Sequence, residues 1–143
     1  MDIVAIGGKL GLFFVPFLFA LCFHEFAHGL VAKWRGDNTA ERMGRLTLNP
    51  LAHADILGTF ILPISSIVFG IPLFFGWAKP VPVDPRNLKN VRTDMFWIAL
   101  AGPASNIILA VVSAVVLFFL IRTPVLIEYH QTISQMLQMF ILT

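Results

Sequence analysis

The chain has 143 residues, of which 57% are hydrophobic and only 13% are charged. That charged fraction is about half the usual value, which excludes a small soluble domain. The formal net charge of +2 is too small to indicate nucleic-acid binding. The one cysteine, Cys22, excludes an internal disulfide and reads as a small buried side chain. We therefore expect an all-α, polytopic membrane helical bundle in one domain, residues 1–143, with about three to four membrane segments.

The first predicted membrane helix is Leu10–Trp34, which is apolar over the roughly 20 residues that a helix needs to cross a bilayer. Lys33 and Arg35 lie in its last turn and Gly36 follows, the usual pattern at a helix C-terminus. Pro16 predicts a kink near the start of this helix. Because the run lacks the basic start and small-residue cleavage site of a signal peptide, we expect it to be retained.

Two further apolar stretches follow: Ile56–Trp77, interrupted by glycines and prolines, and Met95–Ile121. A last amphipathic to apolar run begins at Val125. The polar loops that flank the second stretch, 35–55 and 78–94, both carry basic residues, and the positive-inside rule places both in the cytoplasm. Either the second stretch crosses once and one loop violates the rule, or it enters and returns as a broken, re-entrant hairpin. The hairpin requires a backbone that is buried in protein or lines a wet cavity.

The sequence HEFAH places His24, Glu25 and His28 inside the first predicted helix. Residues i and i+4 share one helix face, so two imidazoles can reach one metal ion with the glutamate beside it. This is the arrangement of zinc hydrolases, in which zinc lowers the pKa of its water to about 7 and the carboxylate carries the proton to the leaving amine. The alternative is a satisfied polar cluster. We favour zinc, because an ionisable group inside a membrane segment costs at least about 2.5 to 3.5 kcal/mol.

The depth of this site follows from helix geometry. Nine residues, or about 14 Å of helix, separate His24 from Lys33. The site is therefore expected within the membrane, nearer the basic end. A hydrolase at that depth would cut peptide bonds inside or beside the bilayer, and it would need a path for water.

Four sequences in order, FHEFAHG, GRLTLNPLAHAD, GWAKPVPVDPRN and ALAGPASN, resemble the site-2 protease family of intramembrane zinc metalloproteases, the M50 peptidases. The resemblance extends from about Leu10 to Ile121 and is closest to the compact prokaryotic branch without a PDZ domain. It implies His24 and His28 as zinc ligands, Glu25 as the catalytic base and Zn²⁺ as the cofactor. It also implies transmembrane protein substrates and a multi-pass protein of the prokaryotic plasma membrane.

The resemblance leaves the third zinc ligand open. In the family this ligand is an aspartate in a downstream motif, and the chain ends before such a motif, so we expect the C-terminal part of the family core to be lacking or another residue to complete the site. A catalytic zinc normally has three protein ligands plus water. The candidate inside the chain is the HAD sequence, with His53 and Asp55. The alternative is that Asp55 caps the helix that follows it.

Two other motifs have alternative interpretations. Asn106, in AGPASN, could donate a hydrogen bond to an oxyanion or could hold two helices together, and His53 is a second candidate for substrate or oxyanion contact. In GWAKPVPVDP, Pro80 and Pro82 exclude a helix and indicate an extended segment. That segment either accepts a substrate strand beside it or forms a rigid interfacial loop anchored by Trp77.

The sequence as a whole indicates an intramembrane zinc endopeptidase that works on transmembrane proteins within the lipid bilayer. Two alternatives belong to other classes. One is a catalytically inactive or fragmentary relative that binds membrane helices, and the other is a membrane metal carrier, which would also use histidines inside the membrane. The sequence leaves the substrate, the trigger of cleavage and the oligomeric state open.

Overall fold

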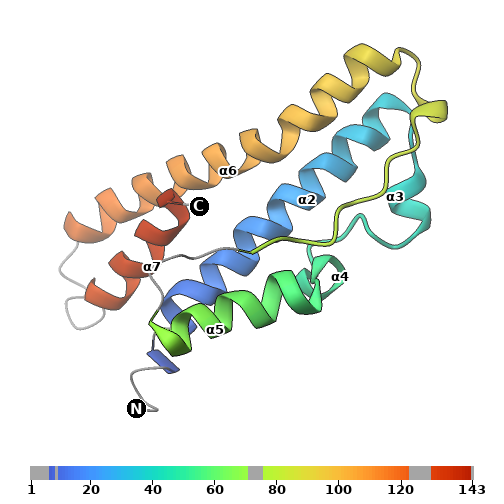
Figure 1. Cartoon of the computed structure of the whole chain (residues 1–143). Coiled ribbons are helices and arrows are strands. Elements are labelled where there is room, and N and C mark those ends of the chain that lie inside the picture. Colours follow the sequence, from blue (N-terminus) through green and yellow to red (C-terminus); the bar gives the residue numbers. More distant parts are fainter. Residues whose placement is uncertain (1–6, 9, 71–75, 123–129, 143) are drawn as a thin grey trace.

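A computed structural model of the chain describes residues 7–8, 10–70, 76–122 and 130–142. Two long helices, α2 (Val15–Arg35) and α6 (Val91–Arg122), pack side by side and run in opposite directions (Figure 1). The shorter elements in chain order are η1 (Leu10–Phe14), α3 (Thr39–Arg42), α4 (Pro50–His53), η2 (Ile56–Ile61), α5 (Leu62–Phe69), η3 (Pro85–Asn87) and α7 (His130–Leu142). The expectation of an all-α fold is confirmed for the described residues, which contain helices and extended connections.

Helix α2 and the π-helical η1 that leads into it form one continuous apolar element, Leu10–Arg35. Pro16 lies in the first turn of α2, where its missing N–H is tolerated, and the irregular π-helical turn directly precedes it. The helix ends as predicted: Gly36 adopts a left-handed conformation with φ 111°, and its N–H donates to the carbonyl of Lys33 at 3.0 Å.

Helix α6 begins at Val91, four residues before the predicted start at Met95. The reason is a pair of reciprocal hydrogen bonds at its N-terminus. The side chain of Asn90 accepts from the Thr93 N–H at 3.2 Å, and the carboxylate of Asp94 accepts from the Asn90 N–H at 2.9 Å. Residues that the sequence analysis placed in a loop therefore form the first turn of the helix.

Two helical elements are long and apolar enough to cross a membrane, Leu10–Arg35 with 26 residues and Val91–Leu120 with 30 residues. Only 17% and 6% of the residues in their most apolar windows are buried inside the structure. The apolar element Ile56–Phe69 is shorter than these two. The described residues thus provide two candidate membrane spans, and the predicted total of about three to four stays a prediction.

The chain after α5 returns along α2 instead of continuing away from it (Figure 1). The N–H of Trp77 donates to the carbonyl of Gly58 at 3.2 Å, which places the returning segment beside the start of η2. The turn itself includes residues 71–75, which lie outside the described residues. The return brings the two polar loops together, since the guanidinium of Arg45 donates to the carbonyl of Lys79 at 2.7 Å.

Candidate metal centre

The two histidines of HEFAH lie one turn apart on the face of α2 that packs against α6. Their ring centroids are 4.7 Å apart with an interplanar angle of 80°. Both Nε2 atoms face Gly102 of α6: a Cβ atom placed there would lie 2.5 Å from Nε2 of His24 and closer still to Nε2 of His28. The predicted convergence of His24 and His28 is therefore present, and a position without a side chain makes room for it.

His28 has a second contact, which orients its ring. Its Nδ1 lies 2.6 Å from the main-chain carbonyl oxygen of Ile98 on α6. A carbonyl oxygen can only accept, so Nδ1 carries a hydrogen, and in the neutral ring Nε2 then keeps its lone pair. Histidines that bind metals are commonly oriented by such a contact at the other ring nitrogen. The ring of His28 is thus held in the tautomer that a metal ion requires.

Glu25 follows His24 in α2 and faces the extended segment 76–84. Its Oε2 accepts a hydrogen bond from the main-chain N–H of Val81 at 2.9 Å. Among the described residues, no hydrogen bond reaches its other oxygen, Oε1. One carboxylate oxygen is therefore held by the protein and the other is open. In the sequence, the one signal that points to Val81 is the pair of prolines that flank it, Pro80 and Pro82, and it does not reveal the contact with Glu25.

Two side chains of the site, those of His24 and His28, have the donor atoms that a zinc ion prefers. His24 and His28 offer neutral imidazole nitrogens, which suit Zn²⁺, and Glu25 supplies a carboxylate beside them. Within residues 7–8, 10–70, 76–122 and 130–142, however, no group of three or more His, Cys, Asp or Glu side chains is placed to hold a metal ion.

His53 and Asp55 of the HAD sequence have hydrogen-bond partners of their own. The side chain of Asp55 accepts from the N–H groups of Leu57 at 3.0 Å and Gly58 at 2.8 Å, so it caps η2, as the alternative interpretation predicts. His53 is fully buried, and its Nε2 lies 2.8 Å from the carbonyl of Thr47. The structure does not test the role of either residue at a metal or an oxyanion, so both roles stay predictions.

Comparison with known proteins agrees with this arrangement. The model of Peptidase family M50 matches residues 12–143. The chain belongs to this family. The resemblance seen in the four sequence motifs is thereby confirmed.

Three bacterial relatives show how much of the M50 chain is shared. "Putative zinc metalloprotease YwhC" of Bacillus subtilis is 39% identical over 107 residues, which are 75% of this chain and 43% of that protein. "Putative zinc metalloprotease Rip2" of Mycolicibacterium smegmatis is 38% identical over 95 residues, 66% of this chain and 35% of that protein. Its namesake from Mycobacterium tuberculosis H37Rv is 32% identical over 108 residues, 75% of this chain and 40% of that protein. The M50 chain thus matches less than half of each relative. No solved structure matches it significantly.

Asn106 of the M50 chain lies one turn after Gly102, on the same face of α6. Its Oδ1 is buried and has no hydrogen-bond partner among the described residues. A polar atom therefore lies unpaired near the interface with α2. This placement is compatible with both interpretations of Asn106, as an oxyanion donor and as a contact between helices.

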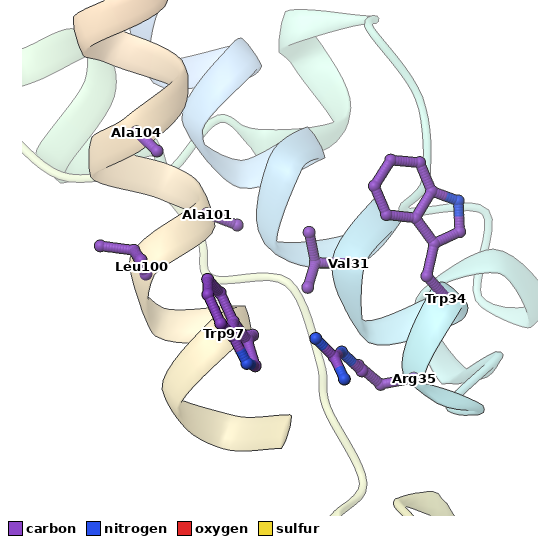
Figure 2. Close-up of a pocket in the computed structure, with 7 residues that line it drawn as sticks. All are labelled: Val31, Trp34, Arg35, Trp97, Leu100, Ala101 and Ala104. Atoms are coloured by element: carbon purple, nitrogen blue, oxygen red, sulfur yellow. The ribbon is translucent and has the colours of Figure 1, made fainter. Parts of the chain in front are cut away.

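An apolar groove of about 250 Å³ lies between α2 and α6 of the M50 chain, beside the C-terminal part of α2 (Figure 2). Its lining includes Val31, one turn after His28, and Ala101, which precedes Gly102 in α6. In Figure 2 the Arg35 guanidinium and the Trp97 ring face one another between the two helices, with 5.7 Å from the guanidinium carbon to the ring centroid. Arg35 also pairs with Asp94 at 3.4 Å. The full lining is Val31, Trp34, Arg35, Trp97, Leu100, Ala101 and Ala104.

Proposed function

We propose that this chain forms the catalytic membrane core of a zinc endopeptidase that hydrolyses peptide bonds in or near transmembrane segments of other membrane proteins. The observation that carries the proposal is the convergence of two imidazole Nε2 atoms on Gly102, with Glu25 beside them, inside an element long and apolar enough to span a bilayer. Membership of the M50 family and the names of the relatives support a zinc metalloprotease.

The location of the site supports cleavage within the membrane. His24 lies about 14 Å from Lys33 along the helix axis, so the site is below the basic, water-facing end of α2. Basic residues flank membrane segments on the cytoplasmic side. We therefore place the site within the cytoplasmic half of a prokaryotic plasma membrane, in a multi-pass protein.

The broken hairpin is our proposal for the course of the second apolar stretch. In this arrangement Ile56–Phe69 enters the membrane, the segment 76–84 returns, and both basic loops stay in the cytoplasm. Two contacts of the returning backbone support it: the Trp77 N–H donates to Gly58, and the Trp77 carbonyl accepts from the Thr59 hydroxyl at 2.8 Å. Non-helical backbone at membrane depth needs such protein partners.

The chain's own residues divide the chemistry among them. His24 and His28 would hold a zinc ion through Nε2. When bound, zinc supplies a Lewis acid that polarises the scissile carbonyl and makes water nucleophilic at neutral pH. Glu25 accepts the proton of the attacking water on Oε1 and passes it to the leaving amine nitrogen. We assign Asn106 Nδ2 as donor to the oxyanion that develops on the carbonyl.

Two histidines leave the ligand set of a catalytic zinc one protein ligand short. We propose that the third ligand comes from outside the described residues, because Asp55 would have to leave its capping position to reach the pair. The same shortfall favours a second candidate function, a relative that binds membrane helices without cutting them.

Zinc content tests the metal site directly. The complete protein, purified in detergent, is compared with Glu25→Gln and with the double variant His24→Ala/His28→Ala. We expect about one zinc per chain in the first two and none in the double variant. If the double variant still contains zinc, the metal binds elsewhere and His24 and His28 are not its ligands.

Membranes from cells that produce the wild type or Glu25→Gln provide the test of cleavage. Mass spectrometry of protein termini is expected to find new termini in or near transmembrane segments only with the wild type. A zinc-loaded wild type that generates no new termini indicates the inactive relative. Zinc transport that survives Glu25→Gln, again without new termini, indicates a metal carrier.

A further inference from the structure

Between Trp77 and Val81, the main-chain donors of the extended segment 76–84 that form hydrogen bonds lie on one side. The N–H of Trp77 donates to Gly58, that of Lys79 to the carbonyl of His53 at 2.8 Å, and that of Val81 to Glu25. The residues between Lys79 and Val81 and directly after Val81 are Pro80 and Pro82, which have no N–H. Alternate residues of an extended chain face opposite sides. The donors of Trp77, Lys79 and Val81 are thereby directed to the same side of the segment, into the protein.

The approach of Val81 to Glu25 depends on a glycine of α2. Gly29 lies one turn after Glu25 on the same helix face. A Cβ atom at position 29 would be 3.2 Å from Cγ1 of Val81, tighter than normal packing. Val81 is only 8% exposed. The missing side chain thus lets the segment lie directly on α2, with the Val81 N–H at the carboxylate.

Polar contacts on both sides of Val81 fix the register of the segment. On one side, the carbonyl of Lys79 accepts from Arg45 at 2.7 Å. On the other side, the N–H of Asp84 donates to the carboxylate of Asp37, a fully buried residue, at 2.8 Å. A shift by one residue would place Pro80 or Pro82 opposite Glu25 and remove the donor. The sequence and the contacts therefore specify Val81 as the residue that meets the carboxylate.

We propose that Val81 is a positioning residue, whose main-chain N–H holds Oε2 of Glu25 so that Oε1 faces the reacting water. The inference rests on the proposed function, because it assumes that Glu25 is the base. A hydrogen bond from a neutral donor to a carboxylate is stronger than one between neutral groups, and it fixes the orientation of the acceptor. A positioned base gains rate from orientation, which a displacement of about 1 Å can reduce about 100-fold.

Proline substitution removes the donor. The variant Val81→Pro is compared with Val83→Pro, a valine of the same segment whose N–H makes no hydrogen bond in the described structure. The probe is a quenched-fluorescent single-span peptide of leucine and alanine with a central glycine pair. We expect Val81→Pro to lower kcat about 10- to 100-fold with KM and zinc content within about twofold of the wild type. Val83→Pro should keep kcat within about threefold.

Restoring the N–H separates positioning from packing. Val81→Ala removes the buried side chain and keeps the N–H, so its kcat should lie much closer to the wild-type value than that of Val81→Pro. Equal losses in Val81→Pro and Val83→Pro overturn the proposal. So does a Val81→Pro variant that loses its zinc, because the effect would then be structural.

Amide hydrogen exchange tests the contact without activity or metal. In the metal-free protein with ¹⁵N-labelled valines, the Val81 amide should exchange about tenfold faster in Glu25→Ala than in the wild type, which is the loss expected when one hydrogen bond of about 1.4 kcal/mol is removed. The helical amide of Val31 serves as the internal reference and should not change. Equal Val81 exchange in both proteins overturns the proposal.

The two experiments separate this inference from the proposed function. If the wild type binds no zinc and cuts no peptide, the proposed function is rejected. The exchange rate of the Val81 amide still shows in that case whether its N–H holds Glu25. A wild type that cuts, with Val81→Pro as active as Val83→Pro, keeps the proposed function and removes only the positioning role.

Discussion

His28 donates a hydrogen bond from Nδ1 to the main-chain oxygen of Ile98, at 2.6 Å, and so links the candidate metal centre to the backbone of α6. The contact orients the ring and leaves the Nε2 lone pair on the side of Gly102, one turn along α6. Both helices therefore form the site. Helix α2 provides the two imidazole side chains. Helix α6 provides the Ile98 carbonyl, which orients the ring of His28, and Gly102, whose missing side chain leaves space for both rings.

The gap at Gly102 leads to the first prediction. In an exposed helix interior, Gly→Ala stabilises a protein by about 1 kcal/mol through helix propensity. At position 102 the added methyl would collide with both imidazole edges, and overpacking of this kind costs about 1 to 3 kcal/mol. We expect Gly102→Ala to lower zinc affinity about tenfold or more, because the rings must move apart. Zinc content after equilibrium dialysis measures the effect.

Gly11 offers a matched control for that substitution. It also lies in a helical turn, and nothing is within 4 Å of an added Cβ. Gly11→Ala should leave zinc affinity unchanged. If Gly102→Ala binds zinc as tightly as Gly11→Ala does, the imidazoles do not depend on the gap and our account of the site geometry is wrong.

The histidines, the glutamate and the end of α2 could be predicted because they depend on spacing within one helix. The HEFAH pattern places His24 and His28 on one face wherever the helix lies, and Gly36 ends it locally. The partner of Glu25 could not be predicted this way. Val81 is 56 residues away, and the contact exists only because the chain turns back along α2.

Asp37 shows the same limit. In the sequence it is one polar residue of a loop, yet it is fully buried in the structure. Its carboxylate accepts from the side chain of Asn87 at 2.8 Å and from the N–H of Asp84 at 2.8 Å. These partners come from the second polar loop, so the burial of Asp37 depends on how the two loops meet. A local pattern carries no information about that contact.

The titration of Asp37 leads to the second prediction. Burial by itself raises the pKa of this carboxyl, but hydrogen bonds from Thr39, from Asn87 and from the Asp84 N–H outweigh it, and the net pKa lies below the ordinary 3.8. A lowered pKa stabilises the fold fully above pH 3.8, and this contribution is lost as the pH falls through the folded-state value. Asp37→Asn should therefore cost about 1 to 3 kcal/mol at pH 7 and progressively less below pH 3.8. Urea unfolding in detergent from pH 7 to pH 3 measures the difference.

The neighbouring Asp84 adds a pH dependence of its own. Arg86 holds the pKa of Asp84 at about 2 through hydrogen bonds to its carboxylate, but wild type and Asp37→Asn both carry it, so their difference isolates Asp37. A difference in unfolding free energy that is constant from pH 7 to pH 3 would contradict the prediction.

The third prediction concerns an exposed ion pair in the same loop region. Lys33 and Glu41 lie 2.6 Å apart, with side chains 40% and 47% exposed. Exposed pairs contribute about 0 to 1 kcal/mol because water and salt screen them. Glu41→Gln should therefore change the unfolding free energy by less than about 1 kcal/mol, well below the effect of Asp37→Asn. Unfolding at low and high salt measures it, and a loss as large as that of Asp37→Asn would show that burial does not decide which loop carboxylate matters.

The last prediction tests the contact that starts the return of the chain. A Cβ atom on Gly58 would clash with the indole ring of Trp77, 2.5 Å from Cγ and Cε2, and would disturb the hydrogen bond from the Trp77 N–H to the Gly58 carbonyl. We expect Gly58→Ala to lower the unfolding free energy by about 1 to 3 kcal/mol. Trp77→Leu removes the ring, so in the double variant the added methyl has space, and the loss should be smaller than the sum of the two single losses. Unfolding of all four proteins in one detergent gives this coupling, and strict additivity would show that the indole does not occupy the position beside Gly58.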